Sequence, residues 1–307
     1  MVLYNGLHII FYMKNYTTFN SYLKKTFHTK VFKVSIDANF TCPNRDGTKS
    51  KLGCIYCDEN GSSTRIHSNK VSIRNQIINN IVIRRTRYKA KKFIAYFQSF
   101  SNTYAPLEKL KKLYEEALFS HPDIAGISIS TRSDCIDEEK VKLIASFREF
   151  LPFVSIELGM QSMHSKTLKI LNRQETLDDF LKAVALIKKY NIHLCIHVIL
   201  GLPNETKEDM LKTAKLLSDL RVDGVKLHML IVLKNTVLHN MYKNNLFSPI
   251  SFDEFTSFAA EFIKLLPKNT IIHRTAGSGY PKDIISPSWI YDEKISIMKT
   301  IDNKLSF

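Results

Sequence analysis

The chain has 307 residues, 44% of them apolar, which is enough to bury one sizeable core and suits one large α/β domain better than two small ones. Its net charge of +15 favours a polyanionic partner such as a nucleic acid, with a broad compositional excess of lysine as the competing explanation. Its five cysteines do not form a disulfide framework, because three are clustered and two stand alone. This excludes the small disulfide-rich secreted proteins and leads us to expect a reducing compartment, the cytoplasm.

The first residues, MVLYNGLHIIFYM, are apolar but carry no basic residue and no small-residue cleavage site. They are also too short to span a bilayer, so we expect no signal peptide and no membrane association. Both Met1 and Met13 remain open as the start of the protein, and residues 1–30 are interpreted as a lead-in to the core.

Strand-like and helix-like segments then alternate along the chain. Because the strands are β-branched or almost continuously apolar, they suit a buried parallel sheet. The predicted strands are Val31 to Asp37, Phe93 to Phe97, Ile124 to Ser130, Phe153 to Gly159, Ile192 to Leu200 and Gly224 to Val232. The predicted helices are Ser72 to Lys91, Pro106 to Phe119, Asp137 to Phe150, Thr176 to Tyr190 and Thr206 to Leu220.

The unusual polar motifs all follow the carboxyl ends of these strands. They are the cysteine loop, QSFSNTY, TRSDC, ELGMQS, GLPNET and LKNT. Barrel enzymes assemble their sites at this end of their strands, so we predict an α/β fold with a partial (β/α)6 TIM-like barrel at residues 31–250. Residues 251–307 are expected to pack on the core as a C-terminal extension with a helix, a short strand at Ile271 and Ile272, and a closing helix after Trp289.

Three cysteines, Cys42, Cys54 and Cys57, lie within sixteen residues. A cluster of the four-iron type is ordinarily held by four thiolates, so three would leave one iron open for a small molecule. A zinc site of the Cys3His type, with His67 as the fourth ligand, is the alternative. The tight trio at the mouth of a barrel favours the cluster.

Several motifs in order resemble a known family. They include VSIDANFTCPNRDGTKSKLGCIYC, YFQSFSNTYAPLEKL, STRSDC, VSIELGMQSMHSKTLKILNR, IHVILGLPNETKEDML, GVKLHMLIVLKNT and IHRTAGSGYPKD. From about Asn15 to Trp289 the chain resembles the YhcC-type radical S-adenosylmethionine proteins, which are similar in turn to the catalytic subunit of Elongator.

The resemblance implies a 4Fe-4S cluster on Cys42, Cys54 and Cys57, whose open iron binds S-adenosylmethionine. An electron from a donor such as flavodoxin or ferredoxin would cleave the sulfonium to a 5′-deoxyadenosyl radical. Carried over by position, the residues expected to bind S-adenosylmethionine are Tyr56, Gln98, Ser99, Thr131, Glu157, Gln161, Arg173, Gly201 and Pro203.

Some of these residues have simpler explanations. Glu157 is either a ribose ligand or a carboxylate satisfied by nearby cations. His197 and His228 are either hydrogen-bonded core residues or participants in substrate binding or proton transfer. The chain also departs from the family, because Asn172-Arg173 is followed by Gln174-Glu175, where the family commonly has Gly-His. The missing His puts in doubt any substrate contact inferred for that loop.

A basic run ends the first predicted helix. Cations at a helix C-terminus complement its dipole, but that explains one or two of them rather than six. We therefore predict a phosphate-contacting surface, which Lys24, Lys25, Lys30 and Lys33 could extend. The six cations are Arg84, Arg85, Arg87, Lys89, Lys91 and Lys92.

The function expected from the resemblance is that of a radical enzyme acting on tRNA. Similar proteins are associated with removal of the carboxymethyl group from wobble 5-carboxymethylaminomethyluridine, which leaves 5-aminomethyluridine. Two alternatives stay open: a radical enzyme of the same fold acting on a protein or a small molecule, and a zinc-stabilised RNA-binding module.

Overall fold

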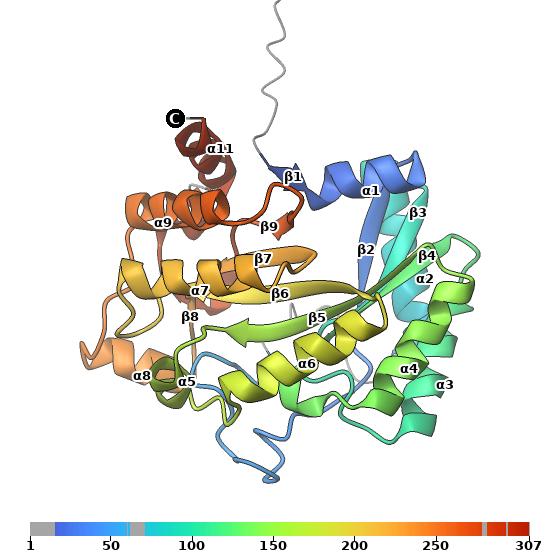
Figure 1. Cartoon of the computed structure of the whole chain (residues 1–307), viewed down its shortest axis with the longest axis horizontal. Helices are drawn as coiled ribbons and strands as arrows, with labels where there is room; N and C mark the ends of the chain where they lie inside the picture. Colours follow the sequence, from blue (N-terminus) through green and yellow to red (C-terminus); the bar gives the residue numbers. More distant parts are fainter. Residues whose placement is uncertain (1–15, 60, 62–70, 278–280, 293, 307) are drawn as a thin grey trace, which may run out of the picture.

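The structure, a computed structural model, describes residues 16–59, 61, 71–277, 281–292 and 294–306. Its centre is an eight-stranded sheet whose strands are all parallel, in the order β1-β9-β7-β6-β5-β4-β3-β2. The sheet curls into a half-barrel of the α/β type (Figure 1). The strands are β1 (Thr17–Thr18), β2 (Val31–Ile36), β3 (Lys92–Phe97), β4 (Ile124–Thr131), β5 (Phe153–Gln161), β6 (His193–Leu200), β7 (Gly224–Met229) and β9 (Ile271–Arg274).

Helices form the connections between consecutive strands, as parallel pairing requires. Figure 1 shows α6 and α7 beside β5, β6 and β7, and α2, α3 and α4 on the side of β2, β3 and β4. The helices are α1 (Phe19–Phe27), α2 (Ile73–Tyr88), α3 (Leu107–Leu118), α4 (Glu138–Ser146), α5 (Ser165–Ile170), α6 (Leu177–Lys189), α7 (Lys207–Asp219), α8 (Val237–Lys243), α9 (Phe252–Leu265), α10 (Trp289–Asp292) and α11 (Lys294–Leu305). None of these helices is long and apolar enough to cross a membrane.

Local sequence explains where the crossover helices begin. The side chains of Thr176 and Thr206 each accept a hydrogen bond from the backbone amide three residues on. The carboxylates of Asp179 and Asp209 at those positions accept a hydrogen bond from the backbone amide of the cap residue. Such capping boxes satisfy amide groups that the first helical turn leaves free. The caps therefore fix the residues at which α6 and α7 begin.

The predicted barrel is confirmed, and the six predicted strands are β2 to β7. One segment differs: the predicted strand from Gly224 to Val232 ends at Met229, and β8 (Val232–Leu233) then pairs antiparallel with β10 (Ile284–Ser286). The Leu230 amide donates to the Leu200 carbonyl, which turns the chain at this point. Apolar composition alone does not mark such a turn, because both parts are buried.

Both ends of the chain add to the sheet. β9 from the predicted extension pairs with β7, and β1 from the predicted lead-in pairs with β9. Helix α1 then packs across the amino-terminal end of the barrel, where Phe19 stacks on His273 with 4.0 Å between ring centroids. The half-barrel is therefore closed at the amino ends of its strands and open at their carboxyl ends.

Candidate functional site

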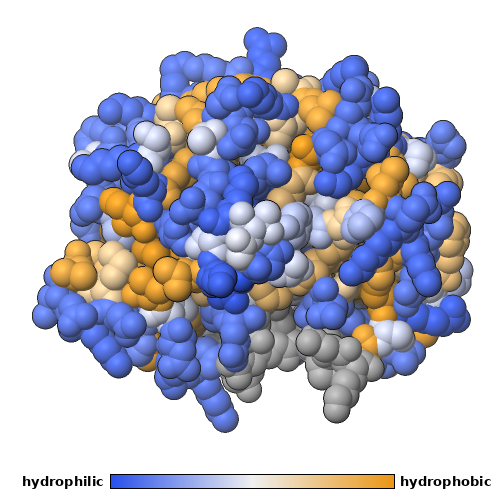
Figure 2. Space-filling model, turned by 90° about the horizontal axis from the view of Figure 1, so that it is seen from below, coloured by the Kyte–Doolittle hydropathy of each residue, from blue (hydrophilic) through white to orange (hydrophobic). Residues whose placement is uncertain are grey.

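A cavity of about 470 Å³ occupies the interior of the half-barrel, and we call it the barrel cavity. It reaches from the loops after the strands down to side chains of β3, β6, β7 and β9. Figure 2 shows the face that carries the cysteine loop; it is largely hydrophilic, with apolar patches to either side. Predicted site residues on the cavity wall are Cys42, Cys54, Tyr56, Cys57, Gln98, Thr131, Gln161, Arg173, His197 and His228.

The three clustered cysteines lie on one wall of the barrel cavity. All three are free thiols; Cys54 is buried, and Cys42 and Cys57 are half-buried. The Cys57 amide donates to the Cys54 carbonyl at 3.0 Å, so the C-x-x-C arm is a tight turn. Free thiols presented together to a cavity form a donor set suited to a metal centre.

The cysteine loop is fixed to the segment after α5. Asn172 Nδ2 donates to the Gly53 carbonyl at 2.7 Å, and Asn44 Nδ2 donates to the Asn172 carbonyl at 2.6 Å. The Ile55 amide adds a bond to the Leu171 carbonyl. Two loops that are far apart in the sequence are thereby held in one arrangement.

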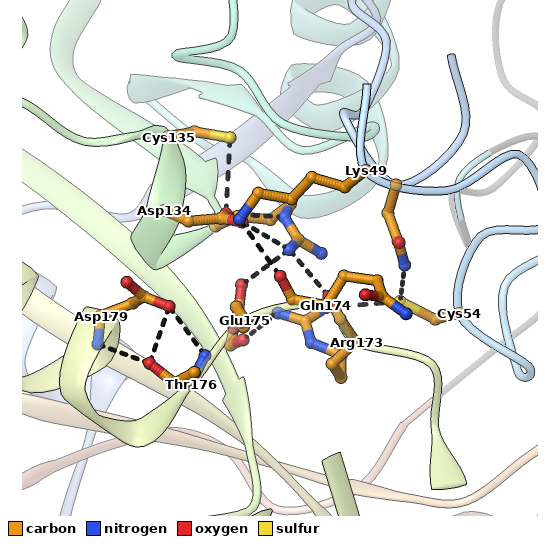
Figure 3. A network of polar contacts seen from close by, with 12 residues as sticks. Lys49, Cys54, Asp134, Cys135, Arg173, Gln174, Glu175, Thr176 and Asp179 are labelled. Carbon is orange, nitrogen blue, oxygen red and sulfur yellow. Dashed lines mark hydrogen bonds and ion pairs between the residues drawn. The ribbon is translucent and has the colours of Figure 1, made fainter. Parts of the chain in front are cut away.

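Arg173 follows this anchor and is 5% exposed. Its Nη2 donates to the Gly159 carbonyl at 2.5 Å and to Glu175 Oε1 at 2.6 Å (Figure 3). Its Nη1 reaches the Tyr56 hydroxyl at 3.3 Å and the Cys54 sulfur at 3.7 Å. The guanidinium is thus held between a buried carboxylate and the cysteine loop.

A second buried arginine extends this arrangement. Arg132 binds Asp134 through two hydrogen bonds of 2.8 Å, and its Nη2 lies 3.3 Å from Glu175. Lys49 of the cysteine loop reaches Asp134 as well (Figure 3). Although burial opposes ionisation, Arg132 and Lys49 hold the pKa of Asp134 at about 2.

Four predicted S-adenosylmethionine contacts do not lie on the wall of the barrel cavity. Ser99 and Pro203 are buried in their loops, and a Cβ on Gly201 would lie 2.8 Å from Ile250. Glu157 lies beneath the cavity and is fully buried. The predicted contacts of these four residues with S-adenosylmethionine therefore stay predictions.

Glu157 is the centre of a buried interior network made by Lys33, Tyr96, Ser128, Glu157, His197 and Lys226. Its carboxylate accepts from Lys33, from Ser128 at 2.7 Å, from His197 at 2.7 Å, from Lys226 at 2.9 Å and from Tyr96 at 3.1 Å. Burial would raise the pKa of Glu157, but the two lysines hold it well below its usual range. Of the two interpretations of Glu157, a carboxylate satisfied by nearby cations matches this geometry.

The predicted basic surface is divided between two places. Arg85 and Lys92 pair with Asp123 at 2.6 and 2.9 Å, and Lys89 caps the C-terminus of α2, so these three cations lie near the start of β3. Arg84 of the same run lines the barrel cavity instead. Lys33 does not extend this surface, because it points into the barrel and binds Glu157. Strand alternation, which places Lys33 on the same face as Ser35, was the signal that could have predicted this.

Several polar residues of the cavity wall were not predicted from the sequence, among them Arg45, Lys226 and Arg274. Lys226 lies in an apolar strand, where its interior direction follows from the two-residue alternation with His228. Arg274 could not have been predicted, because its direction depends on the irregular pairing of β9 with β7. His67, the proposed zinc ligand, lies outside the described residues.

The site leaves donors unused. Arg45 Nε, Arg132 Nη1 and Arg173 Nε are buried and have no hydrogen-bond partner within the described structure. A Cβ on Gly159 would lie 2.8 Å from Gln161 Nε2, so the missing side chain lets the Gln161 amide lie close to the backbone near the Arg173 guanidinium. Buried donors usually have partners, so these features fit a bound group with acceptor oxygens beside the three thiols.

Residues 47–217 match the Radical SAM superfamily, and residues 222–306 match the Radical_SAM C-terminal domain. The chain is 34% identical to YtqA of Bacillus subtilis, over 96% of this chain and 92% of YtqA. It is 30% identical to YhcC of Escherichia coli, over 88% of this chain and 86% of YhcC. A tRNA uridine(34) acetyltransferase of Methanocaldococcus infernus is 28% identical over 53% of this chain and 30% of that protein.

Among solved structures, Elp3 of Methanocaldococcus infernus has the same fold, with a TM-score of 0.66 at 17% identity. The match covers 89% of this chain and 63% of the Elp3 chain. Family membership implies that S-adenosylmethionine and an iron–sulfur cluster are the cofactors of this enzyme. With its half-barrel, its cysteine trio and these relatives, the chain belongs to the YhcC-type proteins of the radical S-adenosylmethionine superfamily.

Proposed function

We propose that Cys42, Cys54 and Cys57 hold a 4Fe-4S cluster with one open iron at the wall of the barrel cavity. The observation that carries this proposal is the presence of three free thiols on one cavity, beside buried donors that lack partners. When bound, the cluster and S-adenosylmethionine would supply the radical chemistry that removes a hydrogen atom from the substrate.

The chain's own residues bind and orient the sulfonium cofactor. The Arg173 guanidinium, fixed by Glu175, offers its remaining donor to a carboxylate, since a planar fork suits that group. Tyr56 supplies an aromatic face beside the cluster loop. Gln98, Thr131 and Gln161 add polar contacts on the same wall.

The substrate we propose is the wobble uridine of tRNA, carrying a carboxymethylaminomethyl group that the enzyme shortens to aminomethyl. The net charge of +15 supports a polyanionic partner. A relative whose name specifies tRNA uridine 34 supports the same class of substrate. An electron donor such as flavodoxin or ferredoxin completes the proposal.

An interior site requires the base to leave its stack. Enzymes that act on a base extrude it into a pocket, and this costs least in a single-stranded loop such as an anticodon. The walls of the barrel cavity would then exclude water from the reacting carbon. The basic run on α2 would contact phosphates at a distance from the reacting base.

Anaerobic purification tests the cofactor proposal. We expect a brown protein that bleaches with dithionite and forms 5′-deoxyadenosine from S-adenosylmethionine. A colourless zinc protein that forms no 5′-deoxyadenosine would refute it.

Nucleoside mass spectrometry tests the substrate proposal. Bulk tRNA from cells lacking the gene should accumulate 5-carboxymethylaminomethyluridine and lose 5-aminomethyluridine. An unchanged profile, with cofactor cleavage intact, would favour a protein or small-molecule substrate.

A further inference from the structure

The interior of the barrel contains more cations than carboxylates among the described residues. Lys33 and Lys226 both bind Glu157, and Arg274 lies beside Lys226 in the pairing of β7 with β9. Two lysines and one arginine thus act on Glu157 at the base of the barrel cavity. Two further carboxylates line the cavity, Asp58 beside the cysteine loop and Asp283 before β10. Because charges interact strongly at low local dielectric, this imbalance produces a positive potential in an enclosed space.

An irregularity in β9 directs Arg274 into this space. Val225 pairs with Ile272 but Lys226 pairs with Arg274, so β9 has one extra residue, His273. His273 is directed to the interior, where its Nε2 lies 2.9 Å from His193 Nε2. Arg274, the next residue, also lines the cavity. Bulges of this kind commonly redirect a side chain at an active site.

Two donors beside Arg274 are unused within the described structure. Lys226 donates to Tyr96 at 2.8 Å and to Glu157 at 2.9 Å, which leaves the third N–H of its ammonium group. His228 Nε2 is buried and has no hydrogen-bond partner. Both side chains line the barrel cavity, so a ligand in the cavity can contact them.

The same region disfavours a cation. Glu157, Cys195 and His197 bring three donor atoms within 4.8 Å of one another, which resembles a metal site. However, Lys33 and Lys226 already neutralise the carboxylate, and they would repel a metal ion. Burial lowers the pKa of His228 well below its usual range, with His197 and Arg274 adding to the effect, so this imidazole is neutral at pH 7. The region is therefore suited to an anion.

We propose that Lys226, His228 and Arg274 form a subsite for a carboxylate carried by the substrate. The inference rests on the proposed function and deepens it, because it assigns the place of the carboxymethyl group. A backbone phosphate cannot follow an extruded base to the base of the cavity, so the anion must belong to the base itself. The guanidinium fork of Arg274 suits a carboxylate.

A small-molecule probe tests the subsite on the cluster-loaded protein with S-adenosylmethionine. N-acetylglycine should raise the melting temperature by about 2–3 °C at a concentration near ten times its Kd, and neutral N-acetylglycinamide should not. Arg274→Gln should abolish the shift. Arg274→Lys, which keeps the charge, should retain most of it and controls for folding. Arg74→Gln, an exposed change on α2, should behave as the wild type.

The proposal is overturned if the amide stabilises as well as the carboxylate, or if Arg274→Gln keeps the shift. It is also overturned if inorganic phosphate matches N-acetylglycine, because the subsite would then not select a carboxylate.

An anticodon stem–loop RNA separates this proposal from the proposed function. The RNA with the free carboxymethyl acid should show a KM at least about tenfold lower than its methyl ester, and Arg274→Gln should remove that difference. Turnover with equal KM values would refute the subsite and leave the tRNA function standing. A carboxylate-specific melting shift without any RNA turnover would support the subsite and refute the tRNA function.

Discussion

Glu175 Oε1 lies 2.6 Å from Nη2 of Arg173, and both side chains are buried. Glu175 binds Arg132 as well, at 3.3 Å. Glu175 therefore belongs to an ion-pair cluster that fixes the Arg173 guanidinium beside Tyr56 and Cys54.

Glu175→Gln should lower the free energy of unfolding by about 2–3 kcal/mol, because it leaves two buried arginines short of a counter-charge. Urea unfolding of the cluster-free protein measures this loss. The exposed Glu149→Gln should change it by less than about 0.5 kcal/mol. Equal unfolding midpoints for the two variants would contradict the structural role of Glu175.

Asn172→Gly should loosen the cysteine loop, because it removes the bonds to Gly53 and Ser50 while keeping a residue that tolerates the φ of 52°. We expect iron release to a chelator at least about fivefold faster than from the wild type, since a lost hydrogen bond is worth about 1 kcal/mol or more.

The matched control is Asn191→Gly, which has a φ of 51° and lies exposed after α6. Its iron-release rate should equal that of the wild type. Equal acceleration by the two variants would mean that backbone flexibility, not the loop anchor, controls cluster retention.

His197→Gln should make the protein less sensitive to acid. Burial, with the charge of Lys226, lowers the pKa of His197 to about 4, so its folded-state pKa is below the unfolded value. Such a group contributes stability that is complete above about pH 6.5 and is lost as the pH falls towards 4. The variant should therefore avoid about 2 kcal/mol of the loss between pH 7 and pH 4.5.

Denaturant unfolding of the cluster-free protein at both pH values measures this difference. Exposed His28, with a φ of 52°, provides the control variant His28→Asn, which should retain the full loss. If His197→Gln loses as much stability as the wild type, His197 is not held neutral by its surroundings.

Replacing any one of Cys42, Cys54 and Cys57 by Ala should abolish the cluster, because only two of its three protein ligands would remain. Iron and sulfide analysis after anaerobic reconstitution measures the loss. Cys135→Ala should keep full iron content, since that buried thiol does not line the barrel cavity. Retention of the cluster in any of the first three variants would refute the ligand assignment.

The strand and helix order was predictable because local patterns and tertiary packing agree. Near-continuous apolar strands such as β6 can be buried on both faces only in a parallel sheet, and the capping boxes at Thr176 and Thr206 begin the crossovers. β1 was not predictable, because its two residues acquire strand geometry only through pairing with β9.

The amino-acid sequence by itself determined the barrel, the cysteine trio and the family, since each depends on residue type and on spacing along the chain. Only the tertiary structure decided which polar residues share a cavity. Glu157 lies beneath the cavity because strand register brings Lys33 and Lys226 to its carboxylate, and Arg274 enters it because of one extra residue in β9. Register and bulges arise from contacts between strands, so no single segment of the chain encodes them.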